Sequence, residues 1–296
     1  MISLWIATFC SASIALLFKL SATKNLSQSW VTMSNYFTAS LFSVVMFLTE
    51  EQRLKPSTEL TATVVIGVIT GVFFLLSFVL YQISVRKNGA SLSGMFAKLG
   101  ILIPMIVSVL VWREIPTMMQ MFGICMAMFA IAVANVSSKA SIKATHSIKW
   151  LLALFVGGGI AEFSNKIFQK TVSLEYRSLF LFLVFATALV LSILMHYAEL
   201  KRQGIKSGRR EVATGDGNIK MSVVVGIFVG IPNLFASYFL LNALNDFPAS
   251  VVYPAYSAGS ILMISILSVV LFKEILYKKD WIAIILTALS LILLNL

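Results

Sequence analysis

Long apolar segments separated by short polar connections make up almost the whole chain. We identify ten of these segments as membrane spans. At roughly twenty residues each, they can cross a hydrocarbon core of about 30 Å; the last segment is somewhat shorter. The predicted spans are residues 3–22, 29–48, 62–85, 90–112, 117–135, 148–171, 176–197, 219–243, 248–272 and 280–296. We expect each span to be an α-helix, because a helix satisfies its own backbone polar groups in lipid.

One stretch of the chain occurs twice. Residues 226–250 resemble residues 67–91, with Gly67 aligned with Gly226, Gly71 with Gly230, and Ala90-Ser91 with Ala249-Ser250. The similarity continues beyond this stretch, since Trp112-Arg113-Glu114-Ile115 aligns with Phe272-Lys273-Glu274-Ile275 and Phe18-Lys19 aligns with Asn165-Lys166. The chain therefore consists of two copies of one membrane module.

Each copy contains five spans. Because five is odd, equivalent helices cross the membrane in opposite directions. The prediction is an all-α polytopic membrane protein of ten transmembrane helices in two inverted five-helix repeats. The repeats are residues 1–137 and 148–296, joined by a linker at residues 138–147. Many secondary transporters are built from inverted repeats of this kind.

Composition supports the membrane assignment. Hydrophobic residues make up 59% of the chain and charged residues 12%, which is too little charge to cover a soluble domain. A net charge of +11 would suggest a nucleic-acid partner in a soluble chain. Here the basic residues lie in short loops, so we expect the lipid bilayer as partner and no nucleic acid.

Cys10 and Cys125 lie inside apolar segments and offer no disulfide or metal framework. The first apolar segment has no convincing cleavage site, so we expect it to be retained. Most basic loop residues lie on the side of the membrane opposite to the first residue, among them Lys24 and Lys201. By the positive-inside rule that side is cytoplasmic, in a plasma or inner membrane, and both termini are outside.

At this point the chain resembles the drug/metabolite transporter superfamily, in its EamA-like ten-helix branch. The resemblance rests on the repeat, on Lys19 near the end of the first span, and on Arg113-Glu114 and Lys273-Glu274 before the last span of each half. It covers nearly the whole chain. The Trp-Gly that is usual in the first span is missing, and Cys10-Ser11-Ala12 stands there.

The resemblance implies an alternating-access carrier of small metabolites. Its central cavity would be lined by the third, fourth, eighth and ninth spans and flanked by the first and sixth. Family members generally have cytoplasmic termini, which is the opposite of the orientation that the loop charges predict. Both orientations therefore stay open.

Glu162 is the leading candidate for a substrate site, because an ionisable residue inside a membrane span is costly and usually functional. It lies about fourteen residues into the sixth span, roughly 20 Å from the surface at which that span begins. With Asn165, Lys166 and Gln169 it forms one polar stripe on an apolar helix. A desolvated carboxylate there would bind a proton or a cationic substrate group. The alternative is a structural pair with Lys166.

Lys98 is the second candidate, about nine residues into the fourth span and too deep for its side chain to reach water unaided. It would bind a carboxylate or phosphate of the substrate. The alternative is a structural lysine that pairs with Glu162 or with backbone carbonyls. Lys19, Lys166 and His196 lie nearer helix ends, so structural or interfacial roles are expected for them.

Neutral polar residues complete the predicted site. The expected substrate-binding residues are Lys98, Glu162, Asn165, Ser77, Tyr81, Asn233, Ser237, Tyr253 and Ser257, with Glu162 also coupling transport to protons. Hydroxyls and amides beside aromatic rings suit a small, partly apolar solute. The alternative role for these groups is hydrogen bonding between helices. Pro232 should kink the eighth span, Pro254 should break the ninth, and a Gly/Pro break is also expected in the fourth.

Other chemistries lack their motifs. The sequence has no G-x-x-x-x-G-K-[ST] loop, no HExxH and no aspartate-rich diphosphate motif, so we expect no catalytic residue, no metal site and no cofactor. The predicted function is a secondary active transporter or exchanger of a small organic metabolite such as an amino-acid-like zwitterion, acting as a monomer or homodimer. The alternatives are an organic-anion or phosphate-ester exchanger led by Lys98 and Lys19, and a membrane-embedded transferase with Glu162 as general base.

Overall fold

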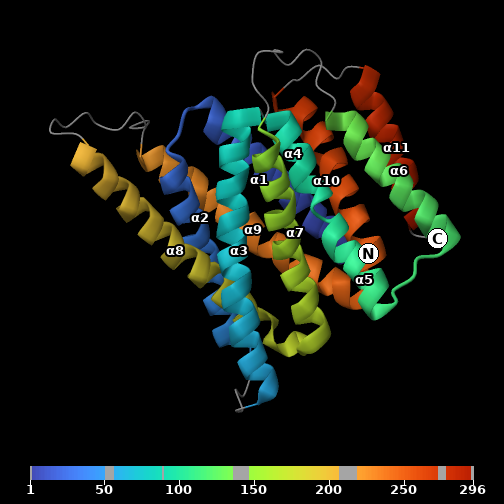
Figure 1. Cartoon of the computed structure of the whole chain (residues 1–296), viewed down its shortest axis with the longest axis horizontal. Helices are drawn as coiled ribbons and strands as arrows, with labels where there is room; N and C mark the ends of the chain where they lie inside the picture. Colours follow the sequence, from blue (N-terminus) through green and yellow to red (C-terminus); the bar gives the residue numbers. More distant parts are fainter. Residues whose placement is uncertain are drawn as a thin grey trace.

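The computed structural model describes residues 2–50, 57–88, 90–135, 147–206, 219–272 and 278–294. Within these ranges every regular element is a helix (Figure 1). The helices are α1 (Ile2–Thr23), α2 (Gln28–Thr49), α3 (Thr58–Asn88), α4 (Ala90–Leu99), α5 (Leu102–Trp112), α6 (Met118–Asn135), α7 (Ile148–Thr171), the 3-10 turn η1 (Leu174–Tyr176), α8 (Arg177–Lys206), α9 (Ile219–Asp246), α10 (Ala249–Phe272) and α11 (Lys278–Leu294).

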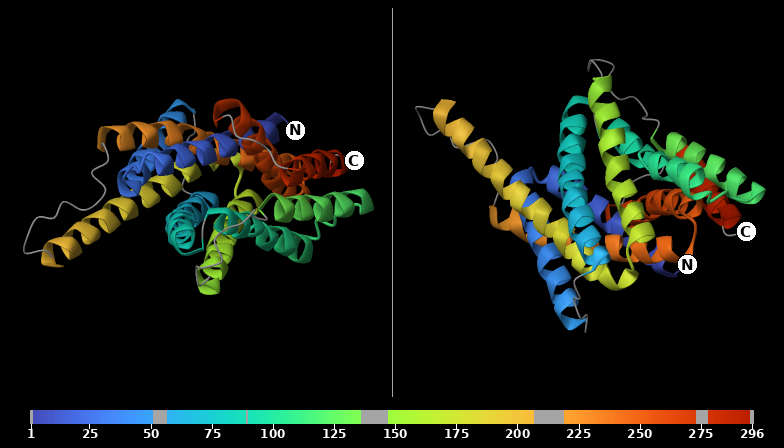
Figure 2. Two further views of the ribbon diagram at one scale, coloured as in Figure 1. Left: turned by 90° about the horizontal axis from the view of Figure 1, so that it is seen from above. Right: turned by 60° about the horizontal axis from the view of Figure 1, so that its bottom comes forward.

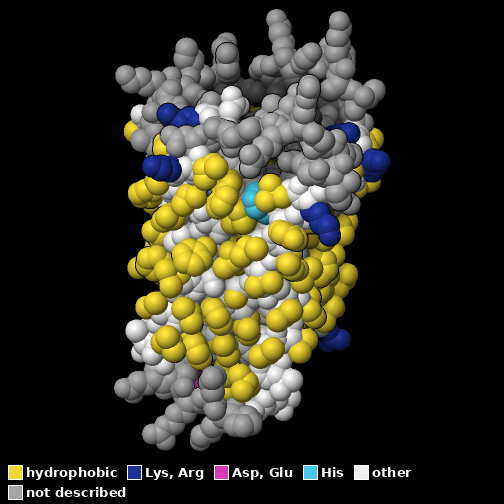
Figure 3. All heavy atoms as spheres, turned by 90° about the vertical axis from the view of Figure 1, so that its left-hand side faces the viewer, with side chains coloured by type: hydrophobic (Ala, Val, Ile, Leu, Met, Phe, Trp, Pro, Cys, Tyr) yellow, Lys and Arg dark blue, Asp and Glu magenta, His cyan; other side chains and the backbone are white. Residues whose placement is uncertain are grey.

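Helices occupy all ten predicted stretches. In the part of the chain that is described, five helices qualify as membrane spans by the criteria of length and apolar composition. Shorter apolar helices occupy the other predicted stretches. Large hydrophobic side chains such as Phe42, Val190 and Phe228 are exposed on the outer surface. Figure 3 shows hydrophobic side chains as a broad belt across the middle of one face of the molecule. Such a belt suits contact with lipid.

Some predicted features lie outside the described residues. They are most of the linker at 138–147, the Lys273-Glu274 pair and the side chain of Lys19.

The fourth predicted span is divided by a break at Gly100-Ile101 into α4 and α5. Pro104 fits in the first turn of α5, because the first N–H groups of a helix have no partner inside it. The break packs closely on α7, since a Cβ added at Gly159 would lie 2.7 Å from the carbonyl oxygen of Gly100. The predicted break at Pro254 is wrong: α10 continues through it, as α9 continues through Pro232.

Contacts between helices recur when the two halves are exchanged. In the first half α3 packs on α7 and α8, and in the second half α9 packs on α1 and α2. A Cβ added at Gly71 would lie 2.5 Å from the backbone oxygen of Val184, and one added at Gly230 would lie 2.6 Å from that of Asn35. The aligned glycines therefore serve the same purpose, which is the close approach of two helices.

Helices α6 and α11 lie side by side at one edge of the bundle, and α8 lies at the opposite edge (Figures 1 and 2). The bundle also has two chemically different ends. Exposed lysines gather at what we term the basic end, namely Lys24, Lys87, Lys149, Lys201 and Lys220. Figure 3 shows most of the visible lysine and arginine side chains near that end. At the other end, termed the Glu114 end, α2, α5, α7 and α9 finish and α3, α6, α8 and α10 begin.

Candidate functional site

A cavity of about 250 Å³ lies near the middle of the bundle, and we term it the charged cavity. Its walls come from α1, α3, α4, α7 and α10, and they include Ser77, Lys98, Glu162 and Ser257. Glu162 lies fourteen residues into α7, which has 24 residues. At 1.5 Å per residue this is about 21 Å from the start of the helix. One chamber near mid-membrane thus contains both a carboxylate and an ammonium group.

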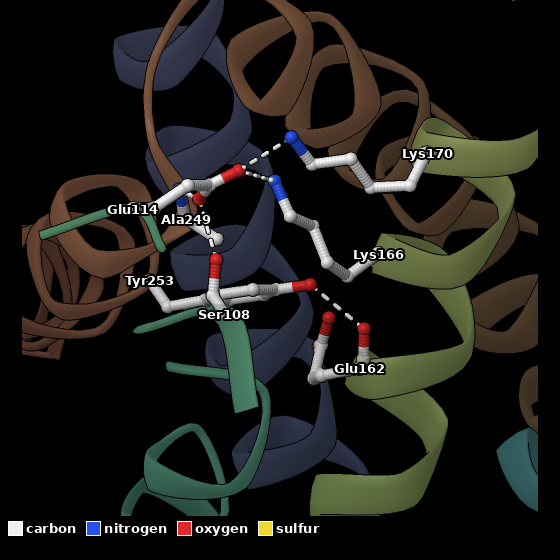
Figure 4. Close-up of polar contacts among 7 residues, drawn as sticks. All are labelled: Ser108, Glu114, Glu162, Lys166, Lys170, Ala249 and Tyr253. Atoms are coloured by element: carbon white, nitrogen blue, oxygen red, sulfur yellow. Dashed lines mark hydrogen bonds and ion pairs between the residues drawn. The ribbon is translucent and has the colours of Figure 1, made fainter. Parts of the chain in front are cut away.

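Glu162 is held by two neighbours, Asn165 and Tyr253, of which Figure 4 shows Tyr253. Asn165 donates a hydrogen bond of 3.2 Å from Nδ2 to Oε2 of Glu162. The hydroxyl of Tyr253, on α10, donates to the backbone oxygen of Glu162 at 2.7 Å. These bonds fix the position of Glu162 and connect α7 with α10 at the level of the cavity.

Lys98 faces the cavity from α4 and lies over the ring of Tyr256, with its Nζ 5.5 Å from the ring centroid. Lys98 and Glu162 attract each other electrostatically. Neither residue forms an ion pair within the described ranges, so both keep bonding capacity for a ligand. Ser257 adds a fully buried hydroxyl that lines the cavity and has no hydrogen-bond partner among the described residues. Orphaned buried polar groups are rare and call for an explanation such as a ligand.

A second cavity of about 230 Å³ adjoins the first, and we term it the aromatic cavity. The two cavities share Phe74, Ser77 and Ala97 as wall residues. The aromatic cavity is lined by five aromatic rings, those of Phe18, Tyr36, Phe74, Phe78 and Tyr81. At its wall Asn233 donates a hydrogen bond of 3.0 Å from Nδ2 to Oδ1 of Asn35, and this bond joins α9 to α2.

The nine residues predicted for the site divide into three groups. Lys98, Glu162 and Ser257 line the charged cavity, Tyr81 and Asn233 line the aromatic cavity, and Ser77 lines both. Asn165 and Tyr253 hold Glu162 in place. Ser237 lines neither cavity, and its hydroxyl bonds to the backbone oxygen of Asn233 at 3.2 Å.

Sequence reasoning missed the contribution of α2. Asn35 and Tyr36 both line the aromatic cavity, and Asn35 is only 1% exposed. The signal was present, since an amide in the middle of an apolar span is costly unless it has a partner. That partner, Asn233, is 198 residues away in sequence. Only the fold reveals the pair.

A cluster of charges lies between the charged cavity and the Glu114 end (Figure 4). Oε1 of Glu114 accepts hydrogen bonds of 2.8 Å from the ammonium groups of both Lys166 and Lys170. Oε2 accepts a bond from the hydroxyl of Ser108 and another of 2.7 Å from the backbone N–H of Ala249. We term these residues the Glu114 cluster. Through it one carboxylate holds α5, α7 and the first turn of α10 together.

The local backbone explains how Glu114 reaches these partners. Arg113 ends α5 in the left-handed conformation, with φ 54°, so the chain turns back and Glu114 folds toward Ser108. Burial alone would raise the pKa of Glu114, but hydrogen bonds from both lysines, Ser108 and Ala249 outweigh it and lower the pKa to about 2. Glu114 is therefore ionised throughout the physiological range. The expected alternative pairing of Lys166 with Glu162 is wrong, because Lys166 bonds to Glu114.

Further polar contacts join helices at the Glu114 end. The guanidinium of Arg177, at the start of α8, donates to Tyr238 and Asn242 of α9 and stacks on the Tyr238 ring, 3.6 Å from its centroid. The hydroxyl of Ser178 donates to Glu50 at 2.7 Å and so joins α8 to the end of α2. This end of the bundle is held closed by interhelical bonds.

Comparison with known proteins agrees with this architecture. Residues 1–136 match the model of the EamA-like transporter family, and residues 211–287 match that of the Small Multidrug Resistance protein family. With the apolar helices, these matches define a multi-pass membrane protein of the transporter class. Both families fit the drug/metabolite transporter superfamily, so the predicted resemblance is confirmed and the chain is a membrane transporter of the drug/metabolite type. Such proteins are typical of the plasma membrane, and EamA-like transporters are generally not enzymes.

An uncharacterized protein of Haemophilus influenzae is 22% identical over 286 residues, which cover 94% of this chain and 92% of that protein. A protein solved by crystallography superposes with a TM-score of 0.69 at 16% sequence identity, over 98% of both chains. At that identity the likeness shows the fold alone.

Proposed function

We propose that the chain is a secondary active transporter, and not an enzyme, which moves a small organic zwitterion across the membrane by alternating access. The observation that carries this proposal is the charged cavity, where Lys98 and Glu162 face one chamber without an ion pair between them. A carboxylate group of the solute would bind Lys98 and Ser257, and an ammonium group would bind Glu162. An amino acid carries both groups.

Glu162 supplies the proposed coupling to protons. A buried carboxylate can be neutralised either by a proton or by the ammonium group of a substrate, and it cannot hold both. Binding of substrate on one side of the membrane and of a proton on the other then gives exchange. Asn165 holds the carboxylate in position in either state, because its amide can donate to an ionised or a protonated oxygen.

The two halves are proposed to be inverted repeats, residues 1–137 and 148–296, that rock against each other. The recurring helix contacts and the matched glycines support this proposal. Opening the Glu114 end would separate α5 from α7 and α10, and would therefore break the bonds to Lys166, Lys170 and Ala249. Lys166 is one helical turn from Glu162, and Tyr253 lies one turn after Ala249. A change at Glu162 is thus transmitted directly to the Glu114 cluster.

Thermal stabilisation of the purified full chain tests the proposal. A ligand that binds only the folded state raises the Tm by mass action. We expect small zwitterions to raise the Tm of the wild-type protein, and to raise those of Lys98→Met and Glu162→Gln far less. Probes with a single carboxylate or phosphate should have weak effects. If no zwitterion raises the Tm, the assignment is wrong.

The alternatives give other outcomes in the same assay. Stabilisation by phosphate esters that depends on Lys98 and not on Glu162 would indicate an organic-anion exchanger. A membrane transferase with Glu162 as its general base would convert the bound solute, so mass spectrometry of the recovered ligand would find a new compound. A transporter returns the ligand unchanged.

A further inference from the structure

We propose that the aromatic cavity is a second subsite of the same binding site, and that it takes a large planar side group of the zwitterion. The inference rests on the proposed function, because the charged group of the ligand lies in the charged cavity. It makes the expected substrate an amphipathic zwitterion with an aromatic ring, rather than a small compound such as glycine.

The two cavities are neighbours with a common wall. Phe74 and Ser77 of α3 and Ala97 of α4 belong to the walls of both. Ala97 is next to Lys98 in sequence, so a ligand held by Lys98 can extend past the small Ala97 side chain into the aromatic cavity. One wall therefore serves both the charged head and the side group.

The rings surround a space and do not fill it. Phe18 and Phe78 have centroids 5.2 Å apart, and Tyr36 and Phe78 have centroids 6.4 Å apart, so α1, α2 and α3 each contribute a ring. Side chains that served only as core would pack to the density of an organic crystal. Here a space of about 230 Å³ remains. Ring faces and edges favour another aromatic ring over an aliphatic chain of similar area.

The amide pair makes this space selective. Asn35 and Asn233 bond to each other, but each amide has more donors and acceptors than this one bond uses. A planar group with a polar atom at its edge, such as a hydroxyl or a ring N–H, could bind one of these free positions. A purely aliphatic group would leave them without a partner, which is unfavourable.

The subsite is tested with four probes on the purified full chain: glycine, phenylalanine, 3-phenylpropanoate and 2-phenylethylamine. We expect phenylalanine to bind at least about tenfold more tightly than glycine, because it buries a ring that glycine lacks. The two single-charge analogues should bind more weakly than phenylalanine.

Phe78→Leu should remove most of this tenfold preference and change glycine affinity by less than about twofold, since it keeps an apolar side chain and loses only the ring. The matched control is Phe228→Leu, the same substitution at a position on α9 that is 60% exposed on the outer surface. This control should retain the preference.

The outcomes separate the two proposals. Equal affinity for glycine and phenylalanine, or equal effects of Phe78→Leu and Phe228→Leu, would overturn the aromatic subsite and leave the zwitterion site standing. Tight binding of 3-phenylpropanoate that depends on Phe78 would support the subsite and overturn the zwitterion assignment. Failure of all four probes to bind would overturn both.

Discussion

At the scale of single residues, the chemistry of the proposed site depends on Glu162. Its carboxylate lines the charged cavity, receives one bond from Asn165, and has no cation bonded to it in the described contacts. The nearby Lys166 is already engaged by Glu114. Glu162 is thus the acid in this region that remains free to exchange a proton for a cationic group.

Glu162→Gln should make solute exchange independent of pH between about pH 5.5 and pH 8 and should slow it by about tenfold or more, because the amide keeps the shape of the carboxylate and cannot titrate. The measurement is the initial rate of uptake into proteoliposomes as a function of pH. Glu175→Gln, at an exposed position in η1 just before α8, is the control and should keep the wild-type pH profile. A pH profile of Glu162→Gln that matches the wild type would exclude the coupling role.

Glu114 makes a different pH prediction. Its pKa is lowered from 4.5 to about 2 in the folded protein, so its stabilising contribution is complete above about pH 4.5 and is lost as the pH falls from there toward 2. Glu114→Gln should lower the free energy of unfolding by about 3 kcal/mol at pH 7, because two lysines, one of them buried, lose their counter-ion.

The Tm values of wild type and Glu114→Gln, measured in detergent, should therefore differ at pH 7 and approach each other below pH 4.5. A difference that stays constant as the pH falls would show that the stabilisation comes from packing and not from ionised Glu114.

At the scale of helices, the repeated glycines set how closely the halves pack. Gly71→Ala and Gly230→Ala should each lower the free energy of unfolding by about 1–3 kcal/mol. The new Cβ would lie 2.5 Å and 2.6 Å, respectively, from a backbone oxygen of the neighbouring helix. Gly158→Ala is the matched control for stability, because its nearest neighbour would be 3.5 Å away. The Tm of each variant is the measurement. Clearly different Tm values for Gly71→Ala and Gly230→Ala would argue against equivalent packing at the two glycines.

The sequence predicted the helices well, because a long apolar segment can be recognised as a membrane helix without knowing which helices pack against it. It also found Lys98 and Glu162, since charges stand out in an apolar segment. It predicted a Gly/Pro break in the fourth span but did not place it at Gly100-Ile101, where Gly100 lies close to Gly159 on α7. The role of Glu114 was also missed, because Lys166 lies 52 residues away and only the packing of α5 on α7 brings them together.

At the scale of the whole molecule, helix contacts correspond between the two proposed repeats, whereas the chemistry of the repeats differs. Gly71 and Gly230 make equivalent contacts in the two halves. A few residues further on, Phe74 packs edge to face on Phe185, whereas Asn233 bonds to Asn35. The first half thus gives the aromatic cavity its rings and Asn35, and the second half gives it Asn233.

The closed Glu114 end makes a prediction about access. In a variant whose Cys10 and Cys125 are replaced by serine, Ser77→Cys should react with a membrane-impermeant thiol reagent from the basic end more than from the Glu114 end. Adding Glu114→Gln should raise its reactivity from the Glu114 end, because the bonds to α7 and α10 are weakened. Lys24→Cys and Glu175→Cys mark the two ends as controls. Equal reactivity from the Glu114 end with and without Glu114→Gln would mean that another contact closes it.

The central claim is that the chain carries a zwitterion across the membrane and leaves it chemically unchanged. Counterflow in proteoliposomes tests it most directly, with unlabelled phenylalanine inside and a trace of labelled phenylalanine outside. We expect transient accumulation of intact label inside wild-type vesicles, and much less of it in vesicles with Lys98→Met or Glu162→Gln. Label that does not accumulate above the level of protein-free vesicles, or that is recovered as a different compound, would contradict the account.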